Sequence, residues 1–165
     1  MRVVVIAASQ FGNTAKIAAA IGRGAEAAGA EIEVLEAADI DPAAILEHRV
    51  DLLVIGGPTV NRKMTAQLER CLAALQPHVR NLAVVVFDTR YRGAELIMGS
   101  AAKRAAKDLA AAGARLVAPP ESFIVVRAEA PAGQRTAPGL SALADGEEAR
   151  AEAWGRQLAG AMTAS

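Results

Sequence analysis

Cysteine and aromatic residues are scarce in this chain of 165 residues. Cys71 is the only cysteine, and aromatic side chains make up 3% of the sequence. A single cysteine excludes an internal disulfide and a cysteine-built metal site, and it is typical of proteins from a reducing compartment. With so few aromatic side chains, the core has to be built from Val, Ile and Leu packed beneath alanine-rich helices.

An excess of charge of one sign is also absent, and so is a long apolar run. The sequence has 18 Lys and Arg against 18 Asp and Glu, so its formal net charge is zero. This balance argues against a globally basic protein that binds nucleic acid or a membrane surface. No apolar run reaches the roughly 18 residues that a membrane-spanning helix needs. Arg2 leads directly into a strand pattern without a signal-peptide pattern, so we expect a cytoplasmic protein with no membrane insertion.

What the sequence does contain is a regular alternation of strand and helix patterns. Strand patterns cover Arg2–Ala7, Glu31–Glu36, Asp51–Ile55, Leu82–Phe87, Arg115–Val117 and Ser122–Val126, the last two forming one split strand. Helical patterns cover Asn13–Ala28, a short segment after Pro42, Thr65–Leu75, about Ala94–Ala112, and a final segment that begins near Asp145. We expect the Asp145 carboxylate to cap that last helix, with Glu148 reaching back to it.

This alternation predicts a single α/β domain over residues 1–165, a three-layer α/β/α sandwich around a five-stranded parallel sheet. Glu31–Glu36 alternates polar and apolar residues, as a half-exposed edge strand does, which gives the strand order 2-1-3-4-5. Ligands of such sheets bind at the carboxyl ends of the strands, so the loops after strands 1, 3 and 4 are candidate site segments. Residues 127–146, rich in Ala, Pro and Gly, are either a lid or a loose connection.

The loop after strand 1 has the features of a phosphate site. It contains hydroxyl, amide and small residues and then opens a helix, whose N-terminal N–H groups attract an anion. The Ser9 and Thr14 hydroxyls and the Asn13 amide offer further hydrogen-bond donors. Neither G-x-G-x-x-G nor G-x-x-x-x-G-K-[ST] is present, which excludes the usual dinucleotide and nucleoside-triphosphate motifs. The alternative is an ordinary capped helix with nothing bound.

The loops after strands 3 and 4 are suited to a flat ligand. The first begins Gly56-Gly57-Pro58, which allows a sharp turn with backbone groups facing a cleft, and the second contains Tyr91, the only tyrosine. Either loop taken alone could equally be an ordinary turn. We find no Ser–His–Asp set and no metal-binding cluster, and we expect His48 and His78 to be surface residues.

Taken together, the three loops read S-x-F-G-N-T, G-G-P-T-x-N and D-T-R-Y-x-G, and with these motifs the chain resembles the flavodoxin family. The resemblance implies a flavodoxin-like fold with non-covalently bound FMN. It assigns the FMN phosphate to Ser9, Gln10, Phe11, Gly12, Asn13 and Thr14. It assigns one edge of the flavin ring to Pro58, Thr59, Val60 and Asn61, and the other to Asp88, Thr89, Arg90, Tyr91 and Gly93. It also implies that Tyr91 stacks on the outer face of the ring.

The chain departs from electron-transfer flavodoxins at three places. Phe11 stands where they usually have a threonine, the loop after strand 3 has no tryptophan, and the loop after strand 4 contains Arg90 and Arg92. A cation near the flavin favours its anionic reduced form by Coulomb attraction. We therefore predict a higher, less reducing two-electron potential than that of a low-potential shuttle flavodoxin.

The resemblance implies an FMN-binding redox protein, and three kinds of function remain open. An electron carrier is favoured, because only Tyr91, Asp88 or solvent would supply a proton at the flavin. The alternatives are an FMN-dependent oxidase or reductase that acts on a porphyrinogen or a quinone, and a regulatory module with weak flavin binding. Residues 88–115, which carry six basic against three acidic side chains, favour an acidic redox partner protein or an anionic small-molecule substrate.

Overall fold

The computed structural model describes residues 1–38, 40–60, 63–92, 100–128 and 141–164. Its helices are α1 (Asn13–Ala27), α2 (Pro42–Leu46), α3 (Ala66–Leu75), the short 3-10 helix η1 (Gln76–His78), α4 (Ala101–Ala111) and α5 (Glu147–Thr163). Its strands are β1 (Arg2–Ala7), β2 (Glu31–Glu36), β3 (Leu52–Val60), β4 (Lys63–Met64), β5 (Ala83–Tyr91), β6 (Arg115–Leu116), β7 (Glu121–Arg127) and β8 (Ser141–Leu143).

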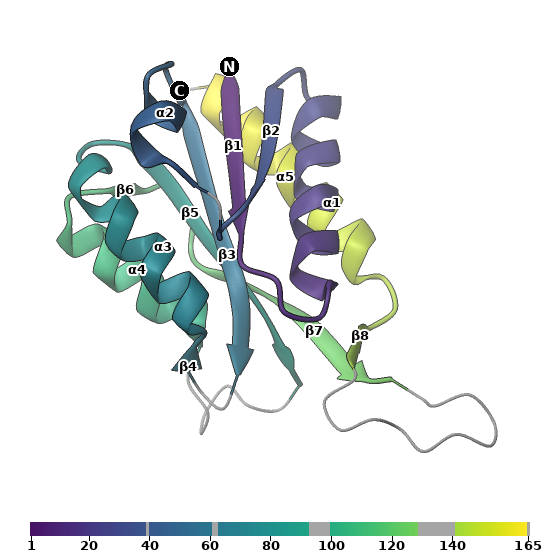
Figure 1. The fold of residues 1–165 in the computed structure, drawn as a ribbon. Coiled ribbons are helices and arrows are strands. Elements are labelled where there is room, and N and C mark those ends of the chain that lie inside the picture. Colours follow the sequence, from purple (N-terminus) through teal and green to yellow (C-terminus); the bar gives the residue numbers. More distant parts are fainter. Residues whose placement is uncertain (39, 61–62, 93–99, 129–140, 165) are drawn as a thin grey trace.

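The sheet confirms the predicted fold class and strand order. Its order is β2-β1-β3-β5-β7-β8, with β4 paired to β3 and β6 paired to β5. Strands β2, β1, β3, β5 and β7 are parallel, and so is β6 to β5, whereas β4 is antiparallel to β3. The predicted fourth and fifth strands correspond to β5 and to the split pair β6 and β7. Helices α1 and α5 cover one face of the sheet, and α3 and α4 cover the other (Figure 1). The carboxyl ends of the central strands therefore meet at one edge, between the two helical layers.

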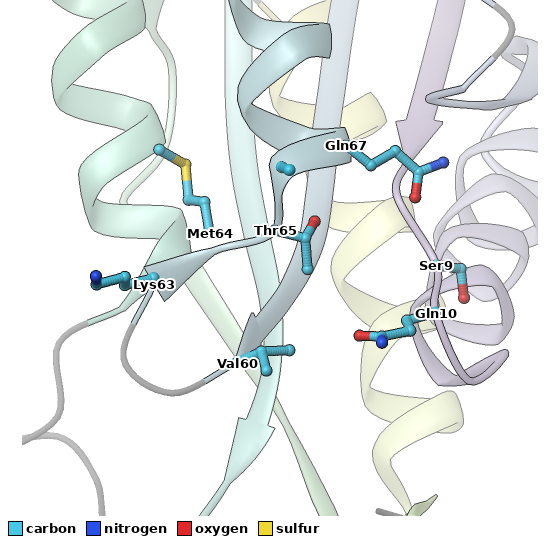
Figure 2. Close-up of a pocket in the computed structure, with 8 residues that line it drawn as sticks. Ser9, Gln10, Val60, Lys63, Met64, Thr65 and Gln67 are labelled. Atoms are coloured by element: carbon cyan, nitrogen blue, oxygen red, sulfur yellow. The ribbon is translucent and has the colours of Figure 1, made fainter.

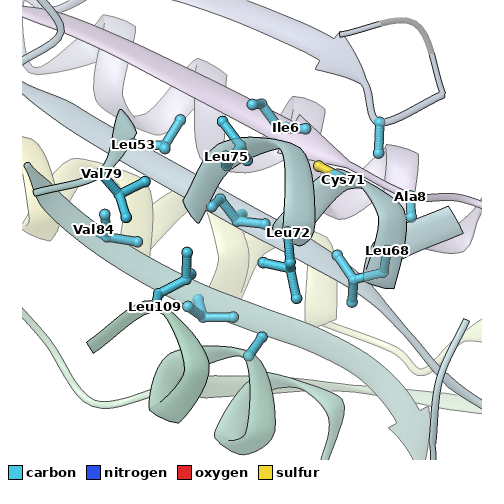
Figure 3. Packing of buried hydrophobic residues seen from close by; sticks show 14 of the residues in the cluster. Ile6, Ala8, Leu53, Leu68, Cys71, Leu72, Leu75, Val79, Val84 and Leu109 are labelled. Carbon is cyan, nitrogen blue, oxygen red and sulfur yellow. The ribbon is translucent and has the colours of Figure 1, made fainter. Parts of the chain in front are cut away.

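Two apolar cores fill the spaces on either side of the sheet. Side chains of a strand point alternately to opposite faces, so Val3 and Val5 of β1 belong to the core beneath α1 and α5. Val4 and Ile6 belong to the core beneath α3 and α4 (Figure 3). Cys71 of α3 lies in this second core, and burial raises the pKa of its thiol to about 12.

Two strands extend further than their sequence patterns predicted. We expected Gly56–Val60 and Asp88–Tyr91 to be loops, but they form the carboxyl-terminal parts of β3 and β5. The parallel pairing continues through them, with Gly57 opposite Asp88 and Pro58 opposite Thr89. Pairing with neighbours thus extends each strand beyond its apolar run.

The segment after β7 is only partly as expected. Ser141–Leu143 forms β8, which pairs antiparallel with β7, so this part of the segment is neither a lid nor a loose connection. The prediction for residues 129–140 lies outside the described residues.

The start predicted for one helix and the cap predicted for another are wrong. The helix predicted over 94–112 does not pass through Ser100, whose backbone is extended and whose hydroxyl accepts a hydrogen bond from the N–H of Lys103. The part of that prediction over residues 94–99 lies outside the described residues. Asp145 does not cap α5 either, because Gly146 is the N-cap residue, with a φ of 83°. Glu147 instead uses its carboxylate to accept hydrogen bonds from Ile124 N–H and Arg150.

Candidate functional site

The three predicted site segments come together at the carboxyl edge of the sheet. Beside them lies a cleft with a volume of about 770 Å³, between the β1–α1 loop on one side and β4 with the start of α3 on the other (Figure 2). It is lined by Ser9, Gln10, Val60, Lys63, Met64, Thr65, Ala66 and Gln67. This volume lies within the range of small-molecule sites in proteins.

The β1–α1 loop leaves the N-terminus of α1 open to an anion. Gly12 is the N-cap residue, with a φ of 82°, and its missing side chain leaves the first turn without a side-chain cap at that position. A Cβ atom added at Gly12 would meet no other atom within 4 Å, so there is space beside the loop. The Ser9 hydroxyl accepts a hydrogen bond from the N–H of Ala15 at 3.3 Å and holds the loop against the helix. This geometry fits the phosphate of FMN.

The side chains of Asn13 and Thr14 are buried and hydrogen-bonded inside the protein. The Asn13 amide donates to the carbonyl and hydroxyl oxygens of Ser141 in β8, at 3.0 and 2.9 Å. The Thr14 and Thr89 hydroxyls share a hydrogen bond of 2.8 Å, which joins α1 to β5. We therefore expect these side chains to fix the shape of the loop, while backbone N–H groups bind the phosphate.

A second network surrounds Asp88, whose side chain has no exposed surface. One of its carboxylate oxygens accepts hydrogen bonds from the Thr59 hydroxyl at 2.8 Å, the Ser100 hydroxyl at 2.6 Å and the N–H of Ala102 at 3.2 Å. The Thr59 hydroxyl in turn accepts a hydrogen bond from the N–H of Ala101 at 2.9 Å. Thr59, Asp88 and Ser100, here called the Asp88 network, thus attach the N-terminus of α4 to the ends of β3 and β5.

The end of β5 presents one buried and two exposed side chains. Arg90 is 5% exposed, and its Nε atom lies 3.7 Å from the carboxylate of Asp88, which offsets its charge. Tyr91 is 46% exposed, and Arg92 is exposed as well. Tyr91 is therefore accessible for the predicted stacking on a flavin, and that role stays a prediction. Asn61 and Gly93, also predicted site residues, lie outside the described residues.

Of the remaining predicted positions, three line the cleft and two do not. Ser9, Gln10 and Val60 line it directly, whereas Pro58 is half-buried in β3. Phe11, at the position where electron-transfer flavodoxins usually have a threonine, is 52% exposed.

Sequence reasoning missed the other wall of the cleft, from Lys63 to Gln67. The Thr65 hydroxyl caps α3 by accepting a hydrogen bond from the N–H of Leu68, and Gln67 donates to Glu36 at 2.9 Å. Glu36 also accepts from the backbone N–H of Ser9, so its carboxylate connects the two sides of the cleft. The predicted start of a helix at Thr65, directly after strand 3, was the available signal that a second helix N-terminus reaches this edge.

The described part of the chain contains no group of three or more His, Cys, Asp or Glu side chains placed to hold a metal ion. None of its helices combines the length and apolar composition that crossing a membrane requires.

Comparison with known proteins identifies relatives of two kinds. The chain is 37% identical over 73 residues to a putative diflavin flavoprotein A 2 of Thermosynechococcus vestitus, a match that covers 43% of this chain and 13% of that protein. Its structure is similar to oxidised flavodoxin 1 of Bacillus cereus, with a TM-score of 0.73, 21% identity, and coverage of 97% of this chain and 98% of the other. It is also similar to the Flv1 flavodiiron core of Synechocystis sp. PCC6803, with a TM-score of 0.74, 20% identity, and coverage of 99% and 36%.

These structural similarities show the fold, and the curated relative is much longer than this chain. The family itself is shown by a sequence profile described as Flavodoxin, which matches residues 5–154, nearly the whole chain. FMN is the cofactor of that family, and the open N-terminus of α1 and the adjoining cleft fit it. The chain belongs to the flavodoxin family and has an FMN-binding redox function.

Proposed function

We propose that the chain is an electron carrier, which exchanges electrons with other redox centres through non-covalently bound FMN. The observation that supports a carrier is the chemistry of the cleft. Among the described residues that line it, Lys63 is the only ionisable one, and none carries a carboxylate, imidazole or phenol group. The nearby Asp88 carboxylate is buried and accepts hydrogen bonds from the Thr59 and Ser100 hydroxyls. An oxidoreductase that moves protons to a substrate would need a group better suited to that task.

Bound FMN supplies reversible one- and two-electron chemistry. The backbone N–H groups at the start of α1 bind its phosphate and set its position along the edge of the sheet. Tyr91, at the end of β5, covers a face of the ring and limits its contact with water. The Asp88 network keeps the ends of β3, β5 and α4 in fixed relative positions. An electron carrier benefits from rigid protein groups around its flavin, because these groups then rearrange little when the charge of the flavin changes.

The binding of FMN tests this proposal first. The protein, stripped of flavin, is titrated with FMN, FAD and riboflavin by fluorescence quenching. We expect FMN to bind more tightly than riboflavin, because only FMN carries the phosphate that α1 attracts. If none of the three binds, the regulatory-module alternative replaces the carrier.

Replacing Tyr91 tests the stacking role. Loss of one aromatic contact costs about 1 kcal/mol, so Tyr91→Ala should weaken FMN binding roughly fivefold. Leu116→Ala is the matched control, because Leu116 is also exposed but lies in β6, which pairs with the opposite end of β5. Equal FMN affinity in Tyr91→Ala and the control would remove Tyr91 from the site.

Electron transfer and catalysis are then distinguished by turnover. In one assay the FMN-loaded protein is reduced and mixed with an electron acceptor, either the one-electron protein acceptor cytochrome c or menadione. In a second assay the oxidised, FMN-loaded protein is mixed with protoporphyrinogen, which donates electrons, and with menadione as the final acceptor. A carrier passes its electrons to the protein acceptor and does not exceed free FMN as a catalyst with the small molecules. Saturable turnover of the quinone or the porphyrinogen would instead support the oxidase or reductase, in which Lys63 would face the substrate.

A further inference from the structure

The two helical layers differ in how their charges are paired. In the layer of α1 and α5, Arg23 pairs with Glu148 and Glu152, and Arg150 pairs with Glu147 and Glu121. Most basic side chains of this layer therefore have an acidic neighbour, and little positive charge is left over to attract another molecule.

The layer of α3 and α4 has the opposite character. Five exposed cations on β4, α3 and α4 form what we call the basic face: Lys63, Arg70, Lys103, Arg104 and Lys107. None of them forms an ion pair with another described residue, whereas Arg23, Arg150 and Arg156 of the other layer do. The acidic side chains on the same elements are Glu69 and Asp108, so positive charge predominates.

The basic face begins at the flavin cleft. Lys63 lines that cleft, and Met64 beside it is buried in the same core as Ala101 and Ala102 of α4. Lys103 and Arg104 lie in the first turn of α4, whose start the Asp88 network holds at the ends of β3 and β5. Positive charge is thus fixed by the fold next to the point where electrons would enter or leave.

The composition of the face indicates what kind of partner it suits. The exposed residues of α3 and α4 are charged or alanine, so these helices offer no large apolar patch for a permanent complex. Complementary charge on small contact surfaces steers fast, short-lived encounters of redox proteins. Residues 63–75 and 101–115 contain no aromatic side chain on which bases could stack, which disfavours single-stranded nucleic acid.

We propose that the basic face docks an acidic redox protein, which exchanges electrons with FMN in the adjoining cleft. This inference rests on the proposed electron-carrier function and adds the partner's chemical class and docking surface. Two strands, β1 and β3, separate acid-rich β2 from β5, so the unequal distribution of charge orients an approaching acidic protein toward α3 and α4.

The test uses protein probes of opposite charge. FMN-loaded protein is titrated by calorimetry, at low ionic strength, with a plant-type [2Fe–2S] ferredoxin as the acidic probe and with cytochrome c as the basic probe. We expect the ferredoxin to bind more tightly, and its affinity to fall as salt is added. Reversing two charges next to the cleft, in Lys103→Glu/Arg104→Glu, should weaken ferredoxin binding about tenfold.

The matched control makes the same change in net charge at the other end of the same layer. Arg80→Glu/Arg115→Glu alters two exposed cations near the start of β5, and it should weaken binding less than about twofold because of screening over distance. Equal loss in both variants, no loss in either, or tighter binding of cytochrome c would overturn the proposal. Binding of a dT20 oligonucleotide that depends on Lys103 and Arg104, without binding of the ferredoxin, would replace it with a nucleic-acid site.

The FMN affinity of each variant is measured in parallel. If the wild-type protein fails to bind FMN, the electron-carrier function fails, yet the same calorimetric comparison with flavin-free protein still shows whether the face binds acidic proteins. If FMN binds and the ferredoxin does not, only the docking proposal fails.

Discussion

Asp88 shows how a residue at the edge of a ligand site can serve the fold. Its carboxylate oxygen is the common acceptor for two hydroxyl groups and one backbone N–H, which come from β3, from the residue before α4 and from α4 itself. Arg90 supplies the nearby positive charge. Removing the carboxylate would leave several buried donors without this acceptor.

We therefore expect Asp88→Ala to lower the free energy of unfolding by about 3–5 kcal/mol, the usual cost of breaking a buried polar network. Urea unfolding followed by circular dichroism measures it. Ser100→Ala, which removes one hydroxyl of the network together with the cap of α4, should cost about 1 kcal/mol. A loss below about 1 kcal/mol for Asp88→Ala would show that the network does not stabilise the fold.

The sequence predicted which three segments meet at the carboxyl edge of the sheet, but it predicted neither the Lys63–Gln67 wall of the cleft nor the direction of several side chains. Loop motifs placed Thr14, Thr59 and Asp88 correctly at the carboxyl edge. Their hydrogen-bond partners, Thr89 and Ser100 among them, lie far away along the chain or in a segment expected to be helical. A motif records a position along a strand, whereas a side chain's partner depends on which strand lies next to it and how far the pairing continues.

At the scale of elements, α1 and α5 pack against each other through their glycines. Gly24 of α1 lies against the backbone of Glu152, and Gly155 of α5 lies against the backbone of Ile21. A methyl group at either glycine would overlap a backbone carbonyl of the other helix. The two helices can approach this closely only because neither position has a side chain.

We expect Gly155→Ala to lower the free energy of unfolding by about 1–3 kcal/mol, since a rigid backbone has to move aside. Gly160→Ala is the matched control, because a Cβ atom there meets nothing within 4 Å. This control should leave stability unchanged or raise it by up to about 1 kcal/mol, as alanine favours a helix. Thermal unfolding of both variants measures the difference, and equal stability would show that the helices can separate without cost.

Element types and their order were predictable, while several boundaries were not. Apolar runs and alanine-rich periodic segments indicated β1, β3, β5 and the helices, because burial on a sheet imposes those patterns. The extension of β3 and β5 and the presence of β8 depend on pairing with distant strands, which one-dimensional periodicity does not record. The predicted Asp145 cap of α5 was wrong for a similar reason. The start of this helix is held by hydrogen bonds from Arg150 and from Ile124 N–H to the Glu147 carboxylate, and Ile124 belongs to a different element, β7.

At the scale of the whole molecule, two carboxylates connect stability to pH. A hydrogen bond from the backbone N–H of Arg2 lowers the pKa of Asp51 below its ordinary value of 3.8. Burial by itself would raise the pKa of Glu147, but hydrogen bonds from Arg150 and from Ile124 N–H outweigh it and lower that pKa below 4.5. Each carboxylate binds its proton less readily in the folded state, so its stabilising effect is present above its ordinary pKa and is lost as the pH falls through the folded value.

The free energy of unfolding should therefore fall as the pH is lowered from about 4.5 toward 2. In Glu147→Gln, which cannot ionise, stability at pH 7 should be lower and the decline toward acid pH smaller than in the wild type. Urea unfolding at pH 7 and pH 3 measures both quantities. An acid decline of the same size in the two proteins would show that Glu147 contributes nothing to it.

The hydrogen bonds between Asn13 and Ser141 also have a consequence for synthesis on the ribosome. Asn13 is fixed by Ser141, 128 residues further along the chain, and α1 packs on α5, which is made later still. At 5–20 residues per second, roughly 6–26 s pass between the synthesis of Asn13 and that of its partner. During this interval the apolar side of α1 has no α5 to cover it, so chaperones can bind it. The β1–α1 loop can take its final shape only after this interval.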